Sequence, residues 1–172
     1  FAQAMNDRKY PLIMYWGWFG HANNHANIMQ INDLINSFDW LSVRKNEAYP
    51  VFTNTSSNDP LPWPNNVSDK SSGQINAFVR WRSVSESADG VETELFLAKP
   101  ASLQTKFEIP PEATADVTLR RLQQLLIAPG ETVRWSYGDS SGEVRADSKG
   151  CVTVPKLKLT SEPVRLSIRK AK

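Results

Sequence analysis

The pattern of hydrophobic and polar residues divides the chain into three segments. In the first, the run Leu12–Trp16 is apolar without alternation, which is typical of a strand buried on both faces, as in a parallel sheet. Gly17 and Gly20 then break the run. After them, apolar residues recur at the spacing of one helix face, at Ile28, Ile31, Leu34, Ile35, Phe38 and Leu41. We therefore predict a strand, a loop and an amphipathic helix in residues 1–48.

The predicted parallel strand lacks neighbours. A parallel strand must pair with others of its kind, and the rest of the chain offers no second strand–helix unit. Either residues 1–48 complete a sheet whose other strands are absent from this chain, or they pack on the second domain. We favour the first arrangement.

Residues 49–73 show no clear period and are rich in proline, asparagine and serine. The stretch Asp59-Pro-Leu-Pro-Trp-Pro64 favours extended or polyproline-like backbone. We predict a linker here. Trp63, which lies within it, is interpreted either as a plug at a domain junction or as a ligand-binding aromatic residue.

From residue 74 onward the hydrophobic period becomes two. One predicted face carries Ile75, Ala77, Val79 and Trp81, and the opposite face carries Asn76, Phe78, Arg80 and Arg82. A turn at Ala88-Asp-Gly90 leads into a return strand with Val91, Thr93, Leu95 and Leu97 on one side. Further predicted strands are Thr105–Ile109, Asp116–Leu122, Thr132–Tyr137, Gly142–Ala146, Cys151–Val154 and Pro163–Arg169.

This succession of short strands and turns predicts a mainly β protein. Residues 74–172 are expected to form an antiparallel β-sandwich of the immunoglobulin or fibronectin III type, with Trp81 and Trp135 as core anchors. Gly138-Asp-Ser-Ser-Gly142 matches the G-x-S-x-G motif of serine hydrolases formally, but a strand pattern follows it where a nucleophile elbow needs a helix. We predict a hairpin turn there.

Composition and charge exclude several classes of function. Of the 172 residues, 40% are hydrophobic and 22% charged, which is typical of a folded protein. A net charge of +2 without a marked basic cluster argues against nucleic-acid binding, and no apolar run is long enough to predict a membrane span. The single cysteine excludes an internal disulfide. His21 and His25 lie four apart but lack acidic ligands nearby, so no metal or other cofactor is expected.

The clearest candidate for chemistry is His21, which follows the Leu12–Trp16 run and its glycine turn. This stretch, with the helix pattern after it, resembles the end of an α/β-hydrolase domain. In that family a histidine on such a loop takes the proton from the serine nucleophile. The whole chain is similar to the C-terminal part of secreted hydrolases of Bacteroides-type bacteria, which carry a β-sandwich after the hydrolase core. The resemblance implies secretion or a periplasmic location, and a serine and an acid upstream of this chain.

Two functions follow as hypotheses. In the first, the chain is the C-terminal portion of an esterase-like or peptidase-like hydrolase. It supplies His21 and an accessory sandwich, is inactive alone, and has the rest of the hydrolase domain or another protein chain as its partner. In the second, it is a non-catalytic module that binds polysaccharide or docks one domain on another. Trp18 and Trp63 are then the candidate ligand-binding residues, because aromatic rings stack on sugars.

Overall fold

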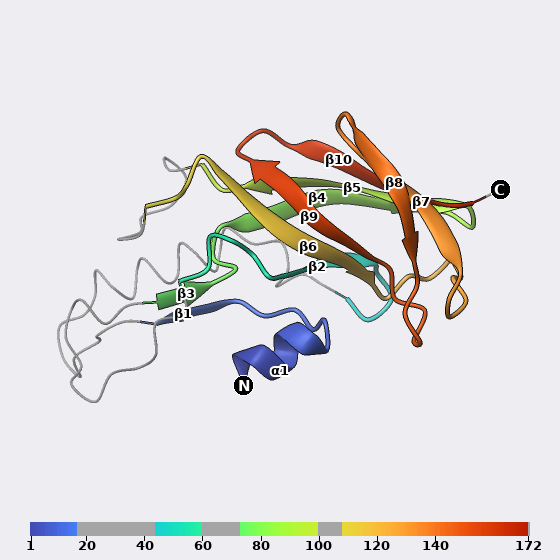
Figure 1. Ribbon diagram of the computed structural model, residues 1–172, viewed down its shortest axis with the longest axis horizontal. Helices are drawn as coiled ribbons and strands as arrows, with labels where there is room; N and C mark the ends of the chain where they lie inside the picture. Colours follow the sequence, from blue (N-terminus) through green and yellow to red (C-terminus); the bar gives the residue numbers. More distant parts are fainter. Residues whose placement is uncertain (17–43, 60–72, 100–107, 172) are drawn as a thin grey trace.

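The chain folds into two antiparallel sheets that pack face to face. The computed structural model describes residues 1–16, 44–59, 73–99 and 108–171 (Figure 1). The larger sheet has the order β4-β5-β10-β7-β8 and the smaller one the order β2-β6-β9. Strands of the larger sheet are β4 (Val79–Glu86), β5 (Gly90–Leu97), β10 (Val164–Lys170), β7 (Thr132–Tyr137) and β8 (Ser140–Arg145). Strands of the smaller sheet are β2 (Tyr49–Thr53), β6 (Glu112–Arg120) and β9 (Thr153–Thr160).

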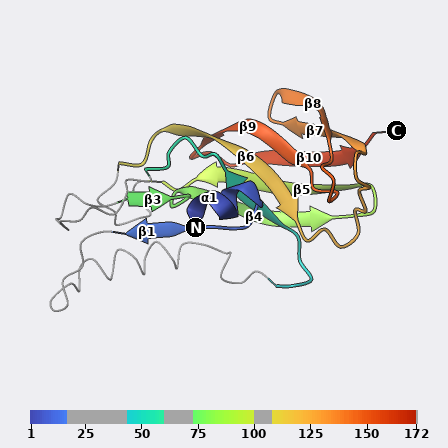
Figure 2. The ribbon, with the colours of Figure 1, turned by 60° about the horizontal axis from the view of Figure 1, so that its bottom comes forward.

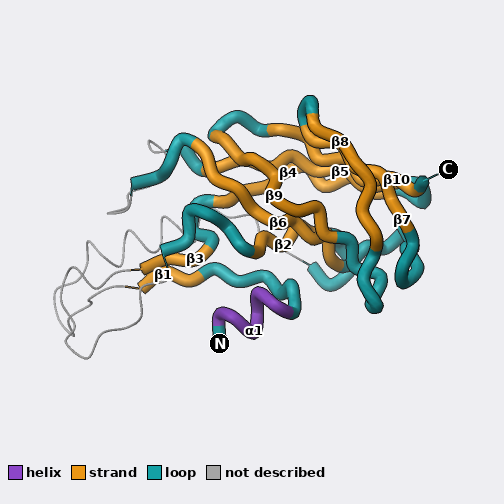
Figure 3. The backbone as a smooth tube through the Cα atoms, in the orientation of Figure 1, coloured by secondary structure: helices purple, strands orange, loops and turns teal. Residues whose placement is uncertain are grey.

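Alternating apolar side chains from both sheets form the core. On β5, Val91, Thr93, Leu95 and Leu97 are buried, as their period of two predicts. Side chains of Val117 and Leu159 close the core from the smaller sheet, and both are fully buried. Removal of this apolar surface from water is the main force that holds the sheets together. The predicted antiparallel β-sandwich is confirmed at this level (Figure 3), while its immunoglobulin or fibronectin III type stays a prediction.

Several strand boundaries agree closely with the sequence pattern. Strand β7 covers the predicted residues, and the β7–β8 hairpin turns at Gly138 and Asp139. Gly138 has a φ of +55°, which glycine adopts without strain. The G-x-S-x-G match is therefore a hairpin, as predicted. Strand β9 begins at Thr153, two residues after the predicted start at Cys151, and runs beyond the predicted end to Thr160.

The predicted parallel strand near the N-terminus is wrong. Residues Met14–Trp16 form β1, which pairs antiparallel with β3 (Gly73–Ile75), so that Trp16 lies opposite Gly73. The two short strands make a separate sheet beside one end of the sandwich (Figure 1). Ile13 and Tyr15 are only partly buried and pack against the sandwich core. The apolar run Leu12–Trp16 therefore reflects contact with the sandwich and not burial inside a parallel sheet. The predicted helix 28–41 lies outside the described residues.

The predicted linker begins with a core strand. All five residues of β2 are buried, and they pair with β6 from Tyr49–Arg120 to Thr53–Asp116. Because every position is covered, the strand shows no alternation, and the sequence pattern missed it. Pro50 is tolerated because β2 is at the edge of its sheet.

The strand predicted from residue 75 is present only from Val79, as β4, and residues of both predicted faces are buried where it begins. Phe78 and Arg80, predicted on the face opposite Ala77 and Val79, have only 1% and 4% of their surface exposed. Arg80 donates hydrogen bonds from its guanidinium group to the carbonyl oxygens of Ala77 and Val79, both at 2.8 Å. Burial lowers the pKa of Arg80 to about 9. Trp81 and Trp135, expected in the core, are only half-buried.

The N-terminal residues are fastened to the sandwich by polar contacts. Helix α1 (Ala2–Asp7) lies beside the sandwich (Figure 2), and Asn6 exchanges two hydrogen bonds with Asn54, each 3.0 Å long. Lys9 bonds to Asp147 at 3.1 Å. Burial would raise the pKa of Asp147, but hydrogen bonds from the N–H groups of Cys151 and Lys149, and from Lys9, outweigh it and hold that pKa below its usual range. No helix in the described part has the length and apolar character to cross a membrane.

The hydroxyl group of Tyr137 is buried without a hydrogen-bond partner among the described residues. Tyr137→Phe should therefore raise the free energy of unfolding by about 1 kcal/mol at neutral pH, measured by urea denaturation. Burial raises the pKa of Tyr137 from 10.0 to about 12. The folded protein thus holds the phenolic proton more tightly, and the wild type should lose stability as pH rises from about 10 through about 12.

The phenylalanine variant should lose less stability over that alkaline range. Tyr10→Phe is the matched control, since Tyr10 is 44% exposed and should change neither quantity. A Tyr137→Phe variant clearly less stable than the wild type would show that the hydroxyl group has a partner after all.

Candidate functional site

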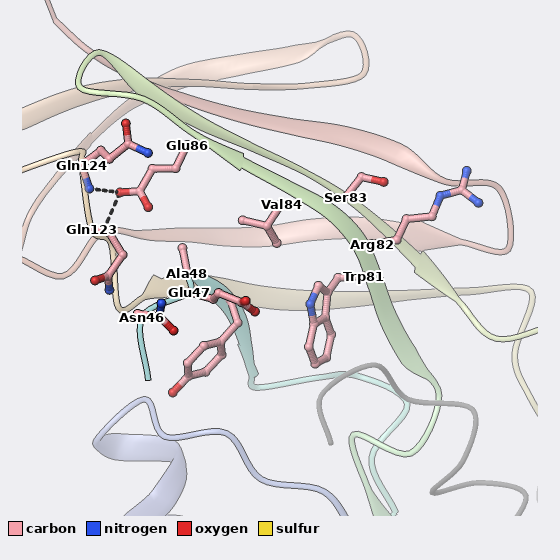
Figure 4. Close-up of a pocket in the computed structure, with 11 residues that line it drawn as sticks. Asn46, Glu47, Ala48, Trp81, Arg82, Ser83, Val84, Glu86, Gln123 and Gln124 are labelled. Atoms are coloured by element: carbon pink, nitrogen blue, oxygen red, sulfur yellow. Dashed lines mark hydrogen bonds between the residues drawn. The ribbon is translucent and has the colours of Figure 1, made fainter. Parts of the chain in front are cut away.

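A groove with a volume of about 420 Å³ lies on the side of the sandwich where β4 faces the start of β2 and the loop after β6 (Figure 4). This volume is in the range of sites for small ligands. Its walls carry an indole ring, side-chain amides and a few charged groups. The lining residues are Asn46, Glu47, Ala48, Tyr49, Trp81, Arg82, Ser83, Val84, Glu86, Gln123 and Gln124.

A β-bulge in β4 shapes the floor of the groove. The pairing of β4 with β5 is regular up to Arg82, opposite Glu94, and resumes with Ser85 opposite Glu92. Two residues of β4 therefore lie opposite one residue of β5. Ser83, inside the bulge, has a φ of +58°, in the left-handed region that non-glycine residues rarely adopt. The bulge shifts the alternation of the strand by one position.

This shift places three side chains on the groove side of β4. Trp81, Val84 and Glu86 are half-buried and line the groove, whereas a regular strand would put Trp81 and Val84 on opposite faces. The indole of Trp81 packs against Phe52, with ring centroids 6.3 Å apart and a 41° angle between the planes. The core therefore holds the ring in place while part of it stays accessible from the groove.

The carboxylate of Glu86 anchors the opposite wall. Its Oε1 atom accepts hydrogen bonds from the backbone N–H groups of Gln123 and Gln124, both at 2.7 Å (Figure 4). It accepts a third, at 2.8 Å, from the N–H group of Leu125. Three converging N–H groups form a positive nest that favours a carboxylate. Leu125 is 1% exposed and fills the core, so the loop is fixed from both sides. The side chains of Gln123 and Gln124 are thereby held at the groove.

Tyr49 closes the groove but offers no free aromatic face. It is only 6% exposed, and the guanidinium group of Arg121 lies 5.3 Å from its ring centroid. Arg121 also donates a hydrogen bond to the carbonyl oxygen of Arg44 at 3.2 Å. The accessible aromatic surface of this site therefore belongs to Trp81.

The groups available in the groove suit non-covalent binding. They are the indole of Trp81, the amides of Asn46 and Gln124, and the hydroxyl group of Ser83. Within the described ranges, no three His, Cys, Asp or Glu side chains gather closely enough to hold a metal ion. The groove can stack a ring and exchange hydrogen bonds with a polar ligand.

A second hollow of about 420 Å³ lies on the outer face of the larger sheet, and we do not assign it a ligand. Arg165 and Arg169 line it, but the Glu92 carboxylate between them is 3.7 Å from the first and 2.7 Å from the second. Both arginines thus share one carboxylate within the sheet. No aromatic side chain of the described ranges lines this hollow.

The structure does not describe the site residues that were predicted from the sequence. His21 and Trp18 fall in residues 17–43 and Trp63 in residues 60–72, all outside the described part of the chain, so their roles stay predictions. The sequence pattern missed Trp81 as a site residue by taking it for a core anchor. The available signal was the loss of alternation at Ser83.

The chain matches no family model, and no curated protein or solved structure is significantly similar to it. The function of the groove is therefore inferred from its own geometry.

The anchoring of the loop by Glu86 can be tested through stability. Glu86→Ala removes three charge-assisted hydrogen bonds and leaves three N–H groups without their acceptor, so the free energy of unfolding should fall by about 2 kcal/mol. Glu112→Ala is the matched control, because Glu112 is 58% exposed and makes one surface ion pair, with Lys158. It should change stability by less than about 0.5 kcal/mol in the same urea titrations. Equal effects of the two substitutions would contradict the anchoring role.

Proposed function

We propose that this chain contains a non-catalytic carbohydrate-binding β-sandwich module, and that the groove beside β4 is its sugar site. The observation that supports this most is the half-buried indole of Trp81 facing the amide-bearing loop of Gln123 and Gln124. A sugar ring has an apolar face that packs on an indole and hydroxyl groups that donate to and accept from amides. Both requirements are met within one groove.

The carboxylates of the groove favour binding over glycoside hydrolysis. Hydrolysis commonly uses two carboxyl groups that flank the scissile bond, one as an acid and one as a base or nucleophile. Here Glu86 is occupied by three backbone N–H groups, and Glu47 lies 3.8 Å from Arg44. Neither carboxylate is placed as a free partner for the other.

One observation that favoured the hydrolase hypothesis no longer holds. It drew on an unpaired parallel strand at Leu12–Trp16, and β1 instead pairs antiparallel with β3. His21 as the general base remains a prediction from the resemblance. A polysaccharide ligand is also compatible with the secreted or periplasmic location inferred from the sequence.

Trp81→Ala tests the proposal. We expect the wild type to bind at least one member of a panel of oligosaccharides in isothermal titration calorimetry. The alanine variant should bind it roughly tenfold more weakly, because one stacked ring contributes about 1.4 kcal/mol. Trp135→Ala is the control, since Trp135 is also half-buried but lies on β7 and packs over Gly142, outside the groove.

Circular dichroism and the melting temperature of both variants separate lost binding from lost folding. Binding that survives Trp81→Ala, or a wild type that binds no member of the panel, would contradict the proposed function.

A further inference from the structure

The charged groups that line the groove already have partners within the protein. On the basis of the proposed function, we infer that the ligand is an uncharged glycan, rather than a uronate-containing or sulfated one. Among the described residues, three that line the groove are charged, and each is engaged by a group of the protein. The neutral groups are the ones left available.

Arg82 is the cation among the described lining residues, and it is turned away from the ligand space. Its Nε lies 2.5 Å from the Glu94 carboxylate, and its guanidinium group lies 5.7 Å from the ring centroid of Phe96. Figure 4 shows its side chain pointing away from Gln123 and Gln124. An anionic sugar in the groove would therefore not meet a free positive charge from Arg82.

The two acidic residues oppose an anionic ligand further. The Glu86 carboxylate accepts hydrogen bonds from backbone N–H groups, and the Glu47 carboxylate pairs with Arg44. Both carboxylates therefore have partners without a positively charged ligand. Both still carry negative charge on the walls of the groove. A carboxylate or sulfate group between them would be repelled, whereas a hydroxyl group would not.

The remaining polar groups match hydroxyl groups. Among the described residues, the side chains of Asn46, Ser83 and Gln124 have no hydrogen-bond partner and are exposed. Gln123 donates through its amide nitrogen to the carbonyl oxygen of Arg121 at 2.6 Å, which leaves its amide oxygen as an acceptor. Amides and hydroxyl groups both donate and accept, as sugar hydroxyl groups do.

The experiment compares one glycan backbone in its neutral and its anionic form. The neutral oligosaccharide bound most tightly in the calorimetric panel is titrated beside its uronate or sulfated counterpart, at 50 and 500 mM NaCl. We expect the neutral form to bind more tightly. Its Kd should change less than about twofold with salt, because no ligand charge is screened.

Glu94→Gln supplies a gain-of-binding test. Glu94 does not line the groove, and its substitution releases Arg82 from their ion pair. It should leave neutral binding unchanged and strengthen anionic binding roughly twofold to fivefold, the size of a surface ion pair. Glu143→Gln is the control, because it releases Arg134 on β7, which does not line the groove. Glu143→Gln should alter neither the binding of the neutral glycan nor that of the anionic one.

Tighter binding of the anionic form, weakened by salt and lost in Trp81→Ala, would overturn the neutral selectivity and leave the carbohydrate site standing. Absence of binding to every glycan would overturn both.

Discussion

The hydrogen bonds of the Glu86 carboxylate are the interaction on which the candidate site depends. Glu86 is the last residue of β4 in the larger sheet. The N–H groups that donate hydrogen bonds to it belong to the loop after β6 of the smaller sheet. One side chain thus connects the two sheets of the sandwich beside the groove. Without it, the loop that carries Gln123 and Gln124 would keep only its anchor at Leu125, and the groove would lose a fixed wall.

The bulge at Ser83 is the second constraint, and it acts together with Glu86. A regular strand that buried Trp81 would turn Glu86 to the other face, since the two residues are an odd number apart. The extra residue brings both to one side. Backbone in a left-handed conformation at a serine is unfavourable, and such strain is concentrated at functional sites in many proteins. Here its consequence is that an indole and a loop of amides face the same groove.

Local pattern predicted much of the sandwich and little of the site. The sequence pattern predicted the strands at Val91–Leu97 and Thr132–Tyr137 because each has one face more buried than the other. Turn residues also mark where each strand begins or ends. Strand β2 was hidden because both of its faces are covered, and β1 was misassigned because its antiparallel partner lies 57 residues along the chain, from Trp16 to Gly73. The contact between Glu86 and Gln123 spans 37 residues and leaves no periodic trace. His21, Trp18 and Trp63 were chosen by residue type, and they lie outside the described residues.

The most direct test of the account is a ¹⁵N heteronuclear NMR titration of the full chain with a neutral oligosaccharide. If the groove beside β4 is the ligand site, the indole N–H signal of Trp81 and the backbone amide signals of residues 123–125 should shift with one common Kd, while the indole signal of Trp135 stays in place. Shifts centred on Trp135 or on the outer face of the larger sheet, with Trp81 unaffected, would contradict it.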